Sequence, residues 1–216
     1  MQNRSFLMGN RISGVILAGG TNSRFSGKTK ANAIVGGKTI IARIISTIED
    51  LFDEIIIVTN TPDDFKDYDC FKIVSDQFVK TGPLGGIHAG LISSTKDAIF
   101  VFAGDMPFLK SELIIKQIEF YKRNDCEALV PQIGQFIEPL HAIYNKSIEY
   151  NLEKYLTDTK NYAVRDYIKM ISTLYMILDG SSSVLKAFSN INSESDINKL
   201  KILPKGLTFT NRWFFV

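Results

Sequence analysis

The chain has 216 residues, of which 45% are hydrophobic and 22% are charged, as in an ordinary soluble globular protein. This length suits one α/β domain with a single core. The 25 basic and 23 acidic residues give 25 − 23 = +2, and they are dispersed along the chain. Long nucleic acid is therefore excluded as an expected partner.

Nothing in the sequence indicates a membrane or an oxidising compartment. Apolar runs such as residues 98–103 are far shorter than the roughly 20 residues that cross a bilayer. Residues 1–12 carry too short an apolar patch for a signal peptide and are predicted to form a disordered or frayed N-terminus. Cys70 and Cys126 lack the spacing of a zinc site or a disulfide framework. We expect a cytoplasmic protein.

From residue 13 onward, short β-branched runs alternate with segments of helical periodicity, which predicts βαβ units around a mostly parallel sheet. The first half of the chain contains predicted strands at 14–18, 54–59, 71–75 and 98–103. Helices are predicted over 40–51 and from Gly82-Pro83 through Leu91. The run 98–103 is apolar on both faces, which is typical of a central parallel strand.

The second half of the chain continues the alternation and ends in an aromatic tail. Helices are predicted near 112–121, 147–156 and 162–170, and strands near 128–131, 141–144 and 173–178. Residues 180–183 are interpreted as a loop. One domain is predicted over 13–200, followed by a C-terminal extension, 201–216, that either packs on the domain or contacts a partner.

The loop after the first strand combines glycines, hydroxyls and cations between Leu17 and Lys30. In a parallel sheet, ligands bind beyond the carboxyl ends of the strands. Backbone N–H groups of this loop can approach phosphate oxygens while Arg24 and Lys30 neutralise their charge. The alternative is an ordinary βα turn. The Gly-Lys-Thr triplets at 27–29 and 37–39 lack the earlier glycine of a Walker loop, and no G-x-G-x-x-G follows the strand.

A second candidate site follows the most hydrophobic strand, where Asp105 lies between Gly104 and Met106. A charge at this position is costly without a partner. Magnesium fits, because it needs only one or two protein carboxylates together with substrate phosphates. The alternative is a helix cap, for which Ser111 is better placed. Together the two candidate sites predict a magnesium–nucleoside triphosphate site.

Seven motifs then recur in a fixed order, namely Leu-Ala-Gly-Gly-x-x-Ser-Arg at 17–24, Lys30, Gly-Gly-Lys at 36–38, Asp76, Gly-Pro-Leu-Gly-Gly at 82–86, Gly-Asp-Met-Pro-Phe-Leu at 104–109 and Pro-Leu-x-Ala-x-Tyr at 139–144. In this order they resemble the molybdenum cofactor guanylyltransferases, the MobA family, over about 14–200. The resemblance implies an α/β, Rossmann-like three-layer nucleotidyltransferase fold with a mostly parallel central sheet.

The resemblance also implies a reaction. GMP would pass from Mg-GTP to the terminal phosphate of molybdopterin, with release of pyrophosphate, to form the guanine dinucleotide cofactor. The implied partners are GTP and molybdopterin, with Mg²⁺ as cofactor and transient contacts with proteins that deliver or receive the cofactor. The attacking phosphate is already ionised, so neither His88 nor His141 is needed as a base.

The functional residues that the resemblance implies fall into overlapping groups. Catalytic roles fall to Arg24, Lys30 and Asp105, and Asp105 is also the metal ligand. Nucleotide contacts are implied for Leu17, Ala18, Gly19, Gly20, Lys30, Asn60, Asp76 and Asp105. Near the C-terminus, Asn190 and Asn192 resemble residues that lie close to the metal, or else they cap a short helix that begins near Ser193.

The sequence departs from the family pattern at two positions, and two other functions compete with this interpretation. Ser26 stands where the family usually has glycine, and Thr29 stands where aspartate is common. One rival is a cytidylyltransferase for the same pterin or a sugar-phosphate nucleotidyltransferase, although Leu-Ala-Gly-Gly favours the guanylyl branch. The other is a non-catalytic nucleotide-binding adaptor. The presence of both Lys30 and Asp105 argues against an adaptor.

Overall fold

The computed structural model describes residues 11–19, 29–191, 193 and 196. Its central sheet has eight strands in the order β10-β7-β9-β6-β1-β4-β5, with β8 beside β7. The strands are β1 Ile12–Leu17, β4 Ile55–Val58, β5 Lys72–Val74, β6 Ala98–Ala103, β7 Ala128–Ile133, β8 Phe136–Ile137, β9 His141–Asn145 and β10 Thr173–Ile177. Strand β1 pairs in parallel with both β4 and β6, β4 pairs in parallel with β5, and β7 pairs in parallel with β10. Both β8 and β9 run antiparallel to their neighbours. The predicted mostly parallel α/β sheet is confirmed.

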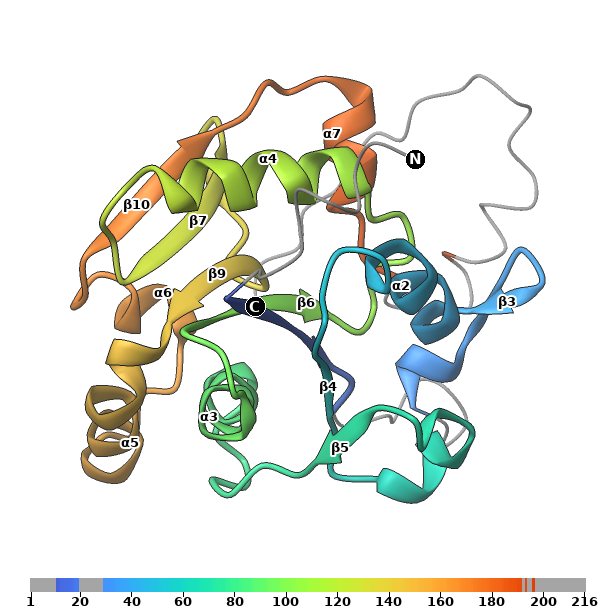
Figure 1. Ribbon diagram of the computed structural model, residues 1–216, viewed down its shortest axis with the longest axis horizontal. Coiled ribbons are helices and arrows are strands. Elements are labelled where there is room, and N and C mark those ends of the chain that lie inside the picture. Colours follow the sequence, from blue (N-terminus) through green and yellow to red (C-terminus); the bar gives the residue numbers. More distant parts are fainter. Residues whose placement is uncertain (1–10, 20–28, 192, 194–195, 197–216) are drawn as a thin grey trace.

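Helices cover both faces of this sheet and give three layers (Figure 1). One face carries α2 Ile40–Ile48 and α4 Ser111–Lys122, and α7 Ser182–Ala187 packs beside α4. The other face carries α3 Pro83–Ser93, α5 Glu149–Asp158 and α6 Val164–Tyr167. Short elements complete the fold: the hairpin of β2 Ile34–Val35 and β3 Lys38–Thr39, and the 3-10 helices η1 Lys30–Asn32, η2 Pro62–Tyr68 and η3 Lys146–Ile148.

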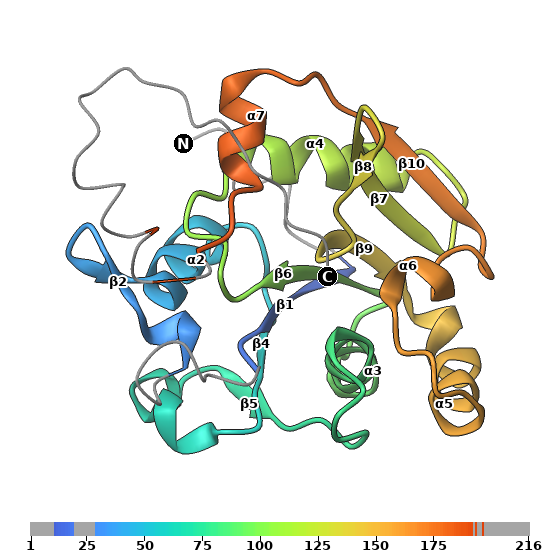
Figure 2. The same ribbon diagram turned by 180° about the vertical axis from the view of Figure 1, so that it is seen from behind.

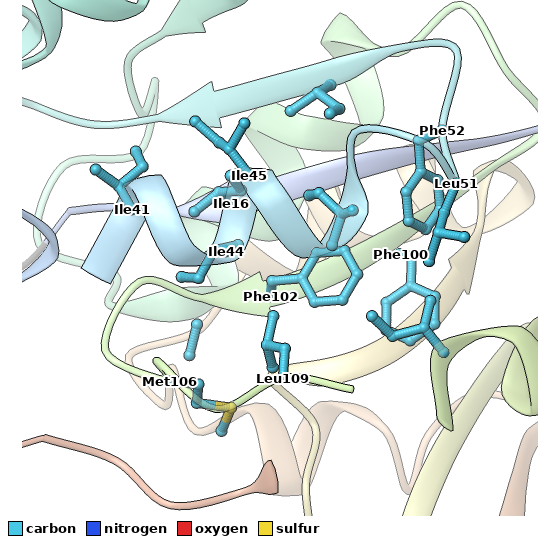
Figure 3. Close-up of a cluster of buried hydrophobic side chains, with 14 of the residues drawn as sticks. Ile16, Ile41, Ile44, Ile45, Leu51, Phe52, Phe100, Phe102, Met106 and Leu109 are labelled. Carbon is cyan, nitrogen blue, oxygen red and sulfur yellow. The ribbon is translucent and has the colours of Figure 1, made fainter. Parts of the chain in front are cut away.

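The larger part of the core lies between α2 and the sheet. The helix begins after Thr39, whose hydroxyl accepts a hydrogen bond from the Ala42 N–H at 3.2 Å, a typical N-cap. Its isoleucines recur at helical spacing and are all buried, at positions 40, 41, 44, 45 and 48. They face the same core as the stacked rings of Phe100 and Phe102 (Figure 3). All six residues of β6 are buried, because helices cover both of its faces.

Several predicted elements need correction. Residues 180–183 are not wholly a loop, because α7 begins at Ser182 and buries Ala187 against α4. Ser111 is the first residue of α4 and not its cap; its hydroxyl donates to the Thr47 carbonyl at 3.3 Å. The helix expected over 162–170 is confined to Val164–Tyr167. The frayed N-terminus expected over 1–12 is wrong at its end, because Ile12 is buried and begins β1, while residues 1–10 and the tail 201–216 lie outside the described residues.

Among the residues that the structure describes, no helix has both the length and the apolar character needed to cross a bilayer.

Candidate nucleotide and metal site

The candidate site lies at the carboxyl edge of the sheet, where β1 and β6 end side by side. The Gly104 N–H donates to the Leu17 carbonyl at 2.9 Å, and the Ala18 N–H donates to the Val58 carbonyl at 2.8 Å. A Cβ added to Gly104 would lie only 2.7 Å from the Leu17 oxygen. Glycine at position 104 therefore allows the ends of β1 and β6 to approach closely, which places the backbone of Leu17 and Ala18 beside the turn that carries Asp105.

The side chains of Lys30 and Asp105 meet at this edge although they are 75 positions apart in the sequence. Their Nζ and Oδ2 atoms are 3.6 Å apart, and the two side chains are 31% and 20% exposed. Burial raises the pKa of Asp105, and the positive charge of Lys30 opposes this effect. The pair offers a cation for phosphate oxygens and a carboxylate for a metal ion in one partly desolvated place.

Contacts with η2 fix the backbone next to Lys30. Thr29 is 2% exposed, and its hydroxyl donates to the Asp64 carboxylate and lies 3.2 Å from the Thr61 hydroxyl. The Asn32 side-chain amide donates to the Asp64 carbonyl at 2.9 Å. Thr29 is the position at which the sequence departs from the aspartate that is common in the family. In this chain a carboxylate reaches that position from η2.

Asn60 and Asp76 form a reciprocal pair at the ends of β4 and β5. The Asn60 amide donates to the Asp76 carboxylate at 3.3 Å, and the Asp76 N–H donates to the Asn60 side-chain oxygen at 3.1 Å. Burial raises the pKa of Asp76, whereas the Asn60 hydrogen bond lowers it. A Cβ on Gly86 would lie 3.7 Å from the Asp76 carboxylate and 3.0 Å from the Leu17 side chain. The start of α3 thus packs close to both residues.

Sequence reasoning missed Glu138, which lies in a bulge of the strand that returns along β7. Gln132 pairs with Ile137, whereas Leu129 pairs with Ile143, so three extra residues interrupt the antiparallel register. The Glu138 N–H donates to the Pro131 carbonyl at 3.0 Å. The following β9 strand then pairs with β6 as well as with β7.

The bulge holds the Glu138 carboxyl at the β6 end of the site. Its side chain accepts from the Leu140 N–H, and the Leu140 carbonyl accepts from the Ala103 N–H at 2.9 Å. Burial raises the pKa of Glu138 to about 7, the negative charge of Asp105 adds to this rise, and Arg165 opposes it. The sequence feature that could have identified Glu138 is its position directly before the Pro-Leu-x-Ala-x-Tyr motif.

The remaining candidate residues are only partly placed. Gly19 and Asn190 are exposed, and Asn190 adjoins Ile191, whose N–H donates to the Asp105 carbonyl at 2.9 Å. Gly20, Arg24, Ser26 and Asn192 lie outside the described residues. The two histidines are core residues: His88 contacts the ring of Phe78, and His141 lies among the rings of Phe100, Phe102 and Phe188.

The donor set fits magnesium better than a metal held by protein ligands alone. Within the described ranges, no group of three or more His, Cys, Asp or Glu side chains is arranged to hold a metal ion. A hard cation that keeps several waters needs only a carboxylate such as Asp105 together with phosphate oxygens. Zinc, by contrast, requires three or four protein ligands. Asp105 is the residue of this edge that could hold such a magnesium ion.

Comparison with known proteins identifies the family. Residues 14–172 match the model of the MobA-like NTP transferase domain. A probable molybdenum cofactor guanylyltransferase of Natranaerobius thermophilus is 35% identical, over 90% of this chain and 97% of its own. The molybdenum cofactor guanylyltransferase of Desulfosudis oleivorans is 33% identical, over 90% and 96%.

A solved structure gives the same fold. Molybdopterin-guanine dinucleotide biosynthesis protein A from Archaeoglobus fulgidus superposes with a TM-score of 0.73 at 22% identity, over 87% of this chain and 96% of that one. At this identity the likeness concerns the fold alone, while the family rests on the domain match and on the relatives above. The chain belongs to the molybdenum cofactor guanylyltransferases, nucleotidyltransferases with a MobA-like NTP transferase domain.

Proposed function

We propose that this protein transfers GMP from Mg-GTP to the terminal phosphate of molybdopterin, releasing pyrophosphate and forming the guanine dinucleotide cofactor. The observation that carries the proposal is the pair of Lys30 and Asp105, 3.6 Å apart beside the backbone of Leu17. A phosphate-binding cation and a metal-binding carboxylate at one sheet edge are what a nucleoside triphosphate requires. The relatives named as guanylyltransferases support GTP as the donor.

Each part of the edge has a role in this proposal. Lys30 binds the triphosphate together with backbone N–H groups of the loop at 17–20, and Arg24 adds a second cation. Asp105 holds the magnesium ion, which when bound neutralises charge on the phosphate oxygens. Asn190 and Asn192 stay proposed neighbours of the metal. Asn60 and Asp76, which pair with each other just beyond the carboxyl ends of β4 and β5, are the proposed contacts of the nucleoside.

The acceptor then occupies the opposite side of Asp105. The sheet order places β4 and β5 on one side of β1, and β6, β9 and β7 on the other. Glu138 and Arg165 belong to this second side. Since the attacking phosphate oxygen is already ionised at neutral pH, the protein aligns it with the α-phosphorus and offsets developing charge without removing a proton.

The nucleotide preference is tested by thermal unfolding with GTP, CTP, UTP or ATP, each with magnesium. A ligand present at 100 times its Kd adds about 2.7 kcal/mol to the free energy of unfolding, so the preferred base gives the largest rise in Tm. We expect GTP to give it. Equal rises with all four nucleotides would contradict guanylyl transfer, and a larger rise with CTP would favour the cytidylyl reaction.

The reaction is tested with Asp105→Asn, incubated with GTP, magnesium and molybdopterin while pyrophosphate and the dinucleotide product are quantified. Asparagine keeps the shape of the side chain but removes the charge that holds the metal. We expect a normally folded protein whose rate is about a hundredfold to a thousandfold lower, the usual loss when one preorganised electrostatic contact is removed. Undiminished turnover would refute the metal role of Asp105.

A further inference from the structure

A segment near the C-terminus contacts the turn after Asp105 at several independent points. We call residues 183–191 the clamp; they comprise most of α7 and the stretch that leads to Ile191. Figure 2 shows α7 beside the beginning of α4, the helix that follows this turn. The clamp is distant in sequence from every strand that forms the nucleotide half of the site.

Side chains of the clamp contact residues at both ends of the turn after Asp105. Lys186 Nζ lies 5.1 Å from the ring centre of Phe108, a cation–π contact, and the Lys110 ammonium donates to the Ser183 hydroxyl. Ile191 is 3% exposed and belongs to the same buried cluster as Met106 and Leu109, both of which point into it in Figure 3.

Phe188 extends these contacts to β6. Its ring lies 4.9 Å from the ring of His141 at 75°, and His141 in turn contacts Phe102 edge-on at 5.5 Å. Phe188 and Ala187 also bury Leu113 of α4. The clamp therefore packs on α4, the helix that follows Asp105, and is linked through His141 of β9 to β6, the strand that precedes Asp105.

The contact that bears most directly on chemistry is a backbone hydrogen bond. The Ile191 N–H donates to the carbonyl of Asp105 itself at 2.9 Å. On the other side of the turn, the Gly104 N–H is held by the Leu17 carbonyl. The peptide that carries the Asp105 carboxylate is thus fixed from β1 on one side and from the clamp on the other.

We propose that Ile191 and Phe188 are positioning residues that set the place of the Asp105 carboxylate, so that the clamp determines how tightly the nucleotide-bound magnesium is held. The inference rests on the proposed function, because it takes Asp105 as the metal ligand. It extends that function to residues that touch neither substrate nor metal. Groups that orient a ligating residue typically contribute about 10- to 100-fold to metal affinity or activity.

The test compares magnesium-free and magnesium-dependent binding of GTP by isothermal titration calorimetry, well below the Tm of each variant. Ile191→Pro removes the donor N–H. Phe188→Leu removes the ring but keeps an apolar side chain, which provides a second reading if the proline variant unfolds. We expect each to raise the magnesium concentration for half-maximal effect, Ile191→Pro by about tenfold or more. The GTP affinity in EDTA should stay within about twofold, since Lys30 is untouched.

Ser182→Pro is the matched control. Ser182 is the first residue of α7, where proline is tolerated, and the preceding Ser181 is already extended, with φ −61° and ψ 148°. It should leave both titrations unchanged. An unchanged magnesium requirement in folded Ile191→Pro and Phe188→Leu proteins would overturn the positioning role of the clamp. So would a parallel loss of GTP affinity in EDTA, which would indicate a merely structural role. Absence of magnesium-dependent GTP binding by the unmodified protein would instead overturn the proposed function.

Discussion

Gly104→Ala is the most direct test of how the two halves of the site are joined. The Gly104 N–H is hydrogen bonded to the Leu17 carbonyl, and an added Cβ would lie 2.7 Å from that oxygen and 3.1 Å from the Ala18 Cα. Real Cβ atoms do not approach backbone so closely. Because both neighbours are backbone atoms, relief requires the end of β6 to move away from the end of β1.

The size of the effect follows from this geometry. Overpacking of a closely packed site costs about 1–3 kcal/mol. In a protein of this length, 1 kcal/mol corresponds to about 2–4 °C, so the Tm should fall by roughly 2–12 °C. A displacement of Asp105 relative to the nucleotide loop approaching 1 Å would lower the transfer rate by about 100-fold. Thermal unfolding and pyrophosphate release, measured at a temperature where the variant is folded, give the two quantities separately.

Gly180→Ala is the control for the loss of a glycine, because the nearest atom to its added Cβ is 3.9 Å away. It should change neither Tm nor rate. A Gly104→Ala protein with the Tm and the rate of the unmodified chain would refute the reasoning, since it would show that the two strand ends can part without consequence.

Two further predictions concern single charges. Lys30→Ala should raise the KM for GTP about tenfold or more, because a charge-assisted hydrogen bond contributes about 1.5–3 kcal/mol. Steady-state kinetics measure this KM, with Lys154→Ala, at an exposed position on α5, as the control variant. An equal KM in both variants would argue against Lys30 as a phosphate ligand. Glu138 has a pKa of about 7 in the folded protein against an ordinary 4.5, so its ionisation lowers the free energy of unfolding as pH rises from 4.5 to 7. In urea unfolding, Glu138→Gln should therefore be more stable than the unmodified protein at pH 8, with a much smaller gain in stability at pH 5. An equal gain in the free energy of unfolding at both pH values would show that the Glu138 carboxyl is not desolvated.

Much of the fold could be predicted from local patterns. The isoleucines of α2 and the unbroken apolar run of β6 each have one physical solution in a layered α/β protein. The direction of β9 could not be predicted, because a strand as short as His141–Asn145 has a sequence pattern that fits a parallel or an antiparallel pairing equally well. The helix α7 was missed because its serines suggest a loop, while its stability comes from burial of Ala187 against α4.

The site was predictable where motifs carry chemistry and not where tertiary contacts create it. Lys30 and Asp105 were identified separately, and the structure shows that they meet. Glu138 was missed because one glutamate beside a short strand has no pattern; its raised pKa depends on its burial and on the charge of Asp105, which only the folded chain creates. Asp64 was missed for a similar reason, since its contact with Thr29 joins elements 35 positions apart.

The bulge at residues 138–140 also bears on how such enzymes diversify. It lies on the side of Asp105 that we propose for the acceptor, in a hairpin whose β9 strand pairs with β6, while β4 and β5 pair on the other side of β1. An insertion or deletion there would alter the proposed acceptor side and leave the register of β1, β4 and β5 unchanged. On the proposed assignment, a change of acceptor therefore requires no change in the strands that bind the nucleotide.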